Sequence, residues 1–145
     1  MASNLLPDTE LLKFHHVGVI SSDLDREVEQ FAALGYHPEG EQFVDATQGV
    51  RGLFLAGQFP RLELLSPLAT QGVLEPWIRS KAKLYHLAYQ TPDLSRAIAE
   101  LCRCGAKVVV NPVAAAAYGD NPIAFVMLPN MLLVELIGEE CSGVL

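Results

Sequence analysis

Two short apolar stretches, seventy residues apart, share one pattern of hydrophobic and polar positions. Residues 84–90 (Leu-Tyr-His-Leu-Ala-Tyr-Gln) and residues 14–20 (Phe-His-His-Val-Gly-Val-Ile) are rich in aromatic and aliphatic side chains, which is typical of β-strands. Because successive side chains of a strand point to opposite faces, His86 shares a face with Ala88. His16 holds the equivalent position in the first stretch. The sequence therefore predicts a duplicated strand that carries one histidine in each copy.

A helical pattern follows each of these strands. Apolar residues at helical spacing predict one helix that continues to Leu34 and a second over residues 94–101, and glycines at 35 and 105 are expected to end them. Each helix is preceded by residues that favour an N-cap. The expected features are an N-cap within Ser21-Ser22-Asp23 with Ser22 and Asp25 as a capping-box-like pair, and an N-cap at Thr91 with Pro92 at the first helical position.

Three short strands are predicted after each helix, so that each half of the chain reads β-α-β-β-β. Module one spans about residues 13–66 and module two about residues 83–138, within a single domain of residues 1–145. The predicted strands cover residues 36–44, 50–55 and 61–65 in module one, and residues 107–110, 123–127 and 131–137 in module two. Residues 73–80 are expected to form a short helical turn, and residues 113–118 a loop or short turn.

The last strand of each module is apolar except for one glutamate, Glu63 in module one and Glu135 in module two. A buried carboxylate is costly unless it is paired or binds a metal. The spacing from His16 to Glu63 is 47 residues and that from His86 to Glu135 is 49, so the repeat places all four residues equivalently. Two imidazoles and two carboxylates suit a divalent ion of Co, Ni, Zn, Mn or Fe, with ligand atoms about 2.0–2.3 Å from it.

Each residue taken alone could instead have a purely structural role, as a histidine packed in the core or a glutamate that faces solvent. Four such residues in register across a repeat favour the metal site. His15 must point away from His16 and is expected to pack, and His37 is expected to be exposed beside a turn.

Charge and composition exclude several classes of protein. The net charge is −7, from 10 basic and 17 acidic residues, and no basic patch is evident, which argues against binding to nucleic acid. No apolar run approaches the ~20 residues that cross a membrane, and residues 1–13 do not resemble a signal peptide. Cys102, Cys104 and Cys141 lack paired spacing, which favours reduced thiols and a cytoplasmic location.

Several motifs taken together resemble the vicinal oxygen chelate superfamily. They are His-His-Val-Gly-Val near the start, Leu-Glu-Leu-Leu-Ser-Pro-Leu in the middle, Tyr-His-Leu-Ala-Tyr-Gln-Thr-Pro-Asp-Leu, Pro-Ile-Ala-Phe-Val and Leu-Val-Glu-Leu-Ile, within residues 14–138. The superfamily includes glyoxalase I, methylmalonyl-CoA epimerase, extradiol dioxygenases, and the fosfomycin and bleomycin resistance proteins. The pattern is most similar to the epimerase and glyoxalase I branch. The resemblance implies the metal ligands His16, Glu63, His86 and Glu135, and a homodimer.

The chain departs from the epimerase pattern in two places. The turn between the last two strands, residues 127–131, replaces a His-Pro-Lys-type turn and a glycine pair with a shorter, more apolar segment. Some epimerases also carry a second carboxylate a few residues after Gln-Gly-Val, whereas here Gln48-Gly49-Val50 is followed by Arg51-Gly52-Leu53. Glu135 and Glu63 are therefore the only candidate catalytic bases.

We predict an α+β fold in which two tandem βαβββ modules form a curved, partly open, eight-stranded barrel-like sheet. The favoured function is a metal-dependent lyase or isomerase that transfers a proton next to a metal-chelated carbonyl of a small-molecule substrate with vicinal oxygens. Arg51, Arg79, Lys81 and Lys83 are either contacts for an anionic part of that substrate or plain surface charges. Two alternatives remain. An extradiol-type dioxygenase is disfavoured by Glu63 as a fourth ligand, and a drug-binding resistance-type protein by the retained ligand set.

Overall fold

The structure, a computed structural model, describes residues 10–68 and 72–139, so Cys141 lies outside the described residues. The elements follow one another in the predicted order. They are β1 (Lys13–Ile20), α1 (Leu24–Ala32), β2 (His37–Asp45), β3 (Val50–Ala56), β4 (Leu62–Pro67), α2 (Glu75–Arg79), β5 (Leu84–Thr91), α3 (Leu94–Arg103), β6 (Lys107–Ala114), a 3₁₀ helix η2 (Ala116–Tyr118), β7 (Pro122–Met127) and β8 (Leu133–Gly138).

The strands form an eight-stranded mixed sheet in the order β2-β3-β4-β1-β5-β8-β7-β6. The two ends of this order, β2 and β6, are edge strands, so the sheet is not closed. The predicted α+β class and the β-α-β-β-β order of each half are thereby confirmed. One boundary was wrong: β6 continues through Val113 to Ala114, because these residues still pair with Ile123 and Pro122 of β7.

The chain divides into two compact units, each described here by itself. One unit spans residues 16–86, and the other combines residues before 16 with those after 86. The single domain expected from the sequence stays a prediction. None of the helices in residues 10–68 and 72–139 is long and apolar enough to cross a membrane.

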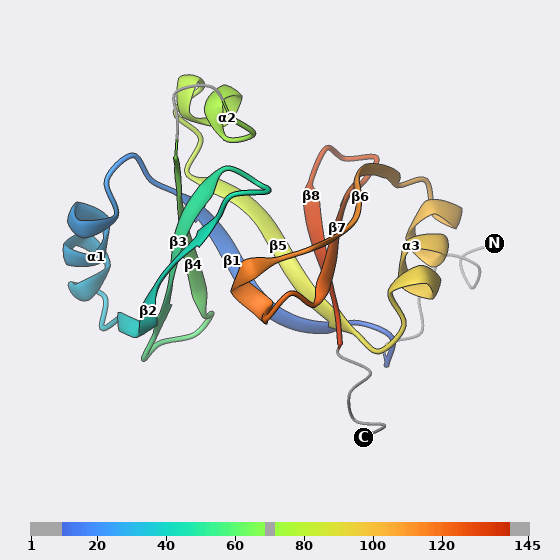
Figure 1. Ribbon diagram of the computed structural model, residues 1–145, viewed down its shortest axis with the longest axis horizontal. Helices are drawn as coiled ribbons and strands as arrows, with labels where there is room; N and C mark the ends of the chain where they lie inside the picture. Colours follow the sequence, from blue (N-terminus) through green and yellow to red (C-terminus); the bar gives the residue numbers. More distant parts are fainter. Residues whose placement is uncertain (1–9, 69–71, 140–145) are drawn as a thin grey trace. The chain divides into compact units, whose positions relative to one another are not determined.

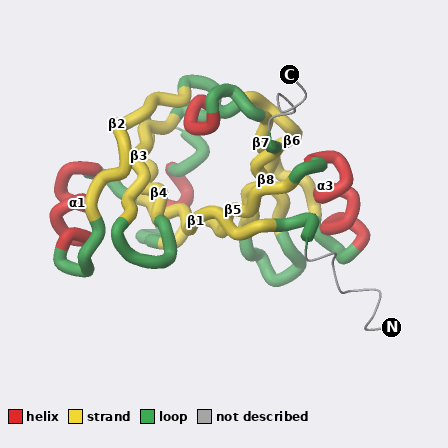
Figure 2. The backbone as a smooth tube through the Cα atoms, turned by 90° about the horizontal axis from the view of Figure 1, so that it is seen from below, coloured by secondary structure: helices red, strands yellow, loops and turns green. Residues whose placement is uncertain are grey.

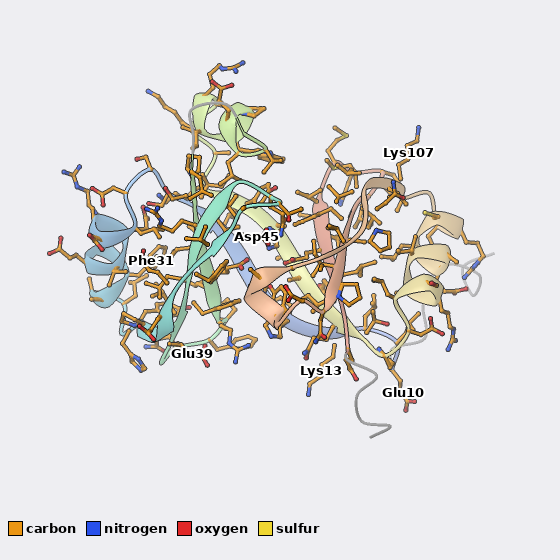
Figure 3. The ribbon with its side chains drawn as sticks, in the orientation of Figure 1. Glu10, Lys13, Phe31, Glu39, Asp45 and Lys107 are labelled. Carbon is orange, nitrogen blue, oxygen red and sulfur yellow. The ribbon has the colours of Figure 1, made fainter. Side chains whose placement is uncertain are left out.

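In the unit of residues 16–86, α1 covers one face of the strands (Figure 1). Strand β1 pairs in parallel with β4, while β2, β3 and β4 pair antiparallel. The side chains between α1 and the strands form a core of Val19, Leu24, Tyr36, Leu53, Leu55, Leu62 and Leu64. Phe31 packs against this core from α1 (Figure 3). Figure 2 shows the same helix beside β2, β3 and β4 in the perpendicular view.

The other unit repeats this arrangement with β5, α3, β6, β7 and β8. Strand β5 pairs in parallel with β8, and β6, β7 and β8 pair antiparallel. Helix α3 lies beside these strands (Figure 2), and its core consists of Leu11, Ala97, Ala106, Val126, Val134 and Leu136. In each module the helix covers one face of the strands, so the side chains on the opposite face do not contact that helix.

The two modules agree down to their hydrogen-bond register. Gly18 pairs with Glu63 across β1 and β4, and Ala88 pairs with Glu135 across β5 and β8. Each glutamate also has a phenylalanine as its antiparallel neighbour, Phe54 on β3 and Phe125 on β7. Since Gly18 and Ala88 each follow a predicted ligand histidine by two residues, the duplication inferred from the sequence is confirmed within each module.

The N-cap of α1 lies within the predicted Ser21-Ser22-Asp23, at Asp23, whereas that of α3 is Asp93 and not the predicted Thr91. Asp23 caps α1 by accepting a hydrogen bond from the backbone N–H of Arg26 (3.2 Å), and Asp93 caps α3 by accepting one from Arg96 (3.1 Å). Carboxylates at this position also interact favourably with the helix dipole. Pro92 therefore precedes the cap. The predicted helix stops are confirmed, because Gly35 and Gly105 have φ of +98° and +103°, which a side chain disfavours.

Candidate metal centre

Strand alternation separates core side chains from candidate ligands in the unit of residues 16–86. Val19 and Leu64 lie in the core beneath α1. Successive strand residues point to opposite faces, so His16, on β1, and Glu63, on β4, point away from that helix. The sequence pattern of single polar residues within apolar strands therefore sets which face carries the ligands.

Three of the predicted ligands converge in this unit. His16 Nε2 lies 3.0 Å from Glu63 Oε1, and His86 Nε2 lies 3.5 Å from the same oxygen. The two Nε2 atoms are 3.1 Å apart. His16, Glu63 and His86 are only 0%, 4% and 2% exposed, so all three are buried. A buried carboxylate in such a place needs a compensating positive charge.

The spacing of the three atoms fits a divalent ion. At a ligand distance of about 2.1 Å, neighbouring ligands of an octahedral ion are about 3.0 Å apart, and those of a tetrahedral ion about 3.4 Å. The separations of 3.0 and 3.1 Å match the octahedral value, and that of 3.5 Å lies within 0.1 Å of the tetrahedral one. Two imidazole nitrogens and one carboxylate oxygen are also the donor types that transition metals prefer. The residues present therefore fit the ion that the sequence predicts.

Glycine and aromatic side chains hold the two histidines in place. A Cβ added to Gly18 would come within 2.6 Å of His86 Nδ1, so His86 packs directly on the β1 backbone. The ring of Phe54 meets His16 edge to face, with centroids 5.4 Å apart. Sequence reasoning missed Phe54. The signal that could have found it is the matching Phe125 on β7, which pairs with Glu135 as Phe54 pairs with Glu63.

Glu135 belongs to the other unit, so the three residues above are the ligands brought together within one unit. Glu135 is only 3% exposed and lies on β8 opposite Ala88 and Phe125. Its Oε1 accepts a hydrogen bond from the Tyr118 hydroxyl at 3.4 Å. Tyr118 is a second residue that sequence reasoning missed, because its alanine-rich surroundings carry no motif.

The remaining histidines behave as expected. His15 packs edge to face on the ring of Tyr118, with centroids 5.8 Å apart, and His37 is exposed. Two of the basic residues considered for an anionic substrate make ion pairs instead: Arg79 with Glu75 at 3.0 Å and Lys83 with Glu27 at 2.8 Å. These contacts favour surface charge as the interpretation for both cations.

An aromatic ring from β2 covers part of the ligand face of β3. Gly52 on β3 is covered by Phe43, since a Cβ at Gly52 would come within 2.7 Å of three atoms of the Phe43 ring. Phe43 in turn lies 5.9 Å from Phe54, centroid to centroid. The ligand face of β3 is therefore apolar beside the imidazole of His16.

Comparisons with known proteins agree with this architecture. The model of the Glyoxalase/Bleomycin resistance protein/Dioxygenase superfamily matches residues 15–125. No curated protein sequence matches the chain. Among solved structures, the methylmalonyl-CoA epimerase of Mycobacterium tuberculosis superposes with a TM-score of 0.78 at 22% identity, covering 98% of both chains. A variant of the Streptomyces coelicolor methylmalonyl-CoA epimerase in complex with 2-nitronate-propionyl-CoA gives 0.75 at 25% identity, covering 90% of this chain and 99% of that one.

Proposed function

Because the chain belongs to the Glyoxalase/Bleomycin resistance protein/Dioxygenase superfamily, we propose that it is a metal-dependent lyase or isomerase. Its substrate is a small molecule with vicinal oxygens, and the reaction moves a proton next to a carbonyl. The observation that carries the proposal is the buried group of His16, Glu63 and His86, whose ligand atoms lie 3.0–3.5 Å apart. A homodimer and a cytoplasmic location stay predictions from the sequence.

The repeat supports Glu135 as the fourth ligand. Glu63 pairs with the residue two positions after His16, and Glu135 pairs with the residue two positions after His86. Side chains two positions apart on a strand share a face, and so do register partners on neighbouring strands. Each module therefore presents its histidine and its glutamate on one face. The metal ligands proposed are His16, Glu63, His86 and Glu135.

The bound ion, Co, Ni, Zn, Mn or Fe, supplies a Lewis acid for the substrate oxygens. The imidazoles of His16 and His86 contribute Nε2 lone pairs in their neutral form. The aromatic rings of Phe54 and Phe43 exclude water from the same face, which strengthens electrostatic interactions there. The imidazoles thus bind the ion and the aromatic rings exclude water, while a carboxylate transfers the proton.

Glu135 is the proton-carrying carboxylate in this proposal, with Glu63 as the other candidate. Glu63 Oε1 already lies within hydrogen-bonding reach of both imidazoles, which restrains it. With Phe43 over Gly52, β3 offers no acid on the opposite side of the substrate. A single carboxylate then removes the α-proton and returns it, in place of the two bases of some epimerases. General-base catalysis of this kind contributes about 10²–10⁴-fold in rate.

The test has two stages. Metal content of the purified protein is measured first, and the cobalt-loaded protein is then incubated in D₂O with 2-oxo acids, hemithioacetals and acyl thioesters. We expect one bound ion per chain and deuterium incorporation next to the carbonyl of one substrate class. Acyl thioesters are tested first because the 25%-identical Streptomyces coelicolor epimerase was captured with a CoA-linked ligand. Absence of exchange across the whole panel would favour a binding protein of the same fold.

A further inference from the structure

The two modules differ in length at one principal place. Val50, the first residue of β3, precedes Glu63 by thirteen residues, and Pro122, the first residue of β7, precedes Glu135 by the same number. The turn between β2 and β3 has four residues, 46–49, whereas the connection between β6 and β7 has seven, 115–121. The extra residues of module two therefore fall in the β6–β7 connection, hereafter loop 115–121.

Loop 115–121 has a defined conformation. It contains η2, and Gly119 leaves this turn in the left-handed region with φ of +63°. Two backbone hydrogen bonds close its base: Ala115 N–H donates to Asn121 O at 3.1 Å, and Asp120 N–H donates to Ala115 O at 3.0 Å. Ala115 is fully buried. The insertion is thus an ordered structural feature that fixes the position of its side chains.

The side chain that this loop places on the functional residues is Tyr118. Its hydroxyl donates to Glu135 Oε1 at 3.4 Å. Its ring meets His15 edge to face at 5.8 Å and 81°, which restricts its rotation. All three residues belong to the same unit. In module one the Glu63 carboxylate lies 3.0 Å from His16 Nε2 and 3.5 Å from His86 Nε2.

We propose that Tyr118 is a positioning residue that orients the Glu135 carboxylate for metal binding and proton transfer. This inference rests on the proposed function, because it takes Glu135 to be a ligand. A hydrogen bond to Oε1 limits rotation of the carboxylate and occupies one of its lone pairs. Partners of this kind typically contribute 10–100-fold to metal affinity or activity. The insertion thereby makes Glu135 different from Glu63, although both occupy the same register position.

Tyr118→Phe tests the proposal, because it removes the hydroxyl and keeps the ring against His15. Cobalt(II) affinity of the metal-free protein is measured by calorimetry, together with the visible absorption spectrum of the bound ion. We expect about 10–100-fold weaker binding and a changed spectrum. The control is Tyr36→Phe, which also removes a buried hydroxyl hydrogen bond, to Pro60 O, within the α1 core. This control should leave cobalt affinity and spectrum unchanged.

A double-mutant cycle separates this inference from the function on which it rests. If Tyr118 acts through Glu135, Tyr118→Phe should cause no further loss of cobalt affinity in a Glu135→Gln background. Wild-type affinity and spectrum in Tyr118→Phe, with weakened binding in Glu135→Gln, would overturn the positioning role and leave the proposed function standing. Wild-type cobalt binding by Glu135→Gln would instead remove Glu135 from the ligand set, and the positioning role with it.

Discussion

The imidazole of His86 occupies the space in which a side chain at Gly18 would begin. A Cβ on Gly18 would lie 2.6 Å from His86 Nδ1 and 2.7 Å from Nε2, closer than non-bonded atoms approach. Gly18 is also the register partner of Glu63 on β4. The His86 ring therefore packs on the backbone of Gly18, next to Glu63 on the neighbouring strand.

Gly18→Ala should displace the His86 ring and weaken metal binding. Because the colliding atoms belong to a buried ring, the ring must shift, and we expect at least a tenfold loss of cobalt(II) affinity by calorimetry. Gly72→Ala is the matched control, since its Cβ would meet no atom nearer than 3.9 Å. Equal cobalt affinity in the two variants would contradict the packing of His86 on Gly18.

Glu63→Gln should weaken cobalt binding while the protein remains folded. The amide keeps the size of the side chain but removes the negative charge that faces both imidazoles, so we expect a loss of about tenfold or more. Glu39→Gln serves as control, because Glu39 forms an exposed ion pair with Arg61 at 3.1 Å. Calorimetry measures the affinities and circular dichroism the fold. A loss of the same size in the control would show that Glu63 has no specific part in binding.

Glu135→Gln should slow proton exchange far more than it perturbs folding. If Glu135 carries the proton, deuterium incorporation at saturating cobalt should fall by about 10²–10⁴-fold. Saturation is needed because the same change is expected to weaken the ion's binding. Exchange at the wild-type rate in the loaded variant would transfer the role of base to Glu63.

Asp23→Ala and Asp93→Ala should each destabilise the protein by about 0.5–2 kcal/mol, since each removes the side-chain cap of a helix. Urea unfolding measures the change. Ser22→Ala is the informative control, because the sequence alone favours Ser22 in the capping pair. The control should have a small effect, and a loss equal to that of Asp23→Ala would reinstate Ser22.

The strand residues were the most predictable part of the chain. A period of two was enough to place His16, Glu63 and His86 on one face. The caps were less predictable, because Ser22, Asp23 and Thr91 have similar capping chemistry and the choice depends on where the preceding strand ends. Ser21 N–H still donates to Leu65 O at 2.8 Å, so the strand pairing extends past Ile20 and the cap moves to Asp23.

Tyr118 and Phe54 could not be predicted, for a different reason. Tyr118 lies in loop 115–121, where local sequence does not encode which strand residue the side chain will reach. Its contact with Glu135 depends on the turn geometry at Gly119. Phe54 reads as an ordinary strand residue, and only the pairing of β3 with β4 places it opposite Glu63. Both residues act through tertiary contacts that strand periodicity does not specify.

The parallel pairing within each module has a consequence for folding kinetics. Val17 pairs with Leu62, and Leu87 with Val134, so each of these contacts closes a loop of more than forty residues, whereas the antiparallel hairpins close short ones. Long-range closure is slow because the chain loses the entropy of closing a long loop before the stabilising contacts between the strands have formed. In module one this parallel pairing brings His16 to Glu63, so this contact forms late. A bound ion should accordingly slow the unfolding rate more than it accelerates folding.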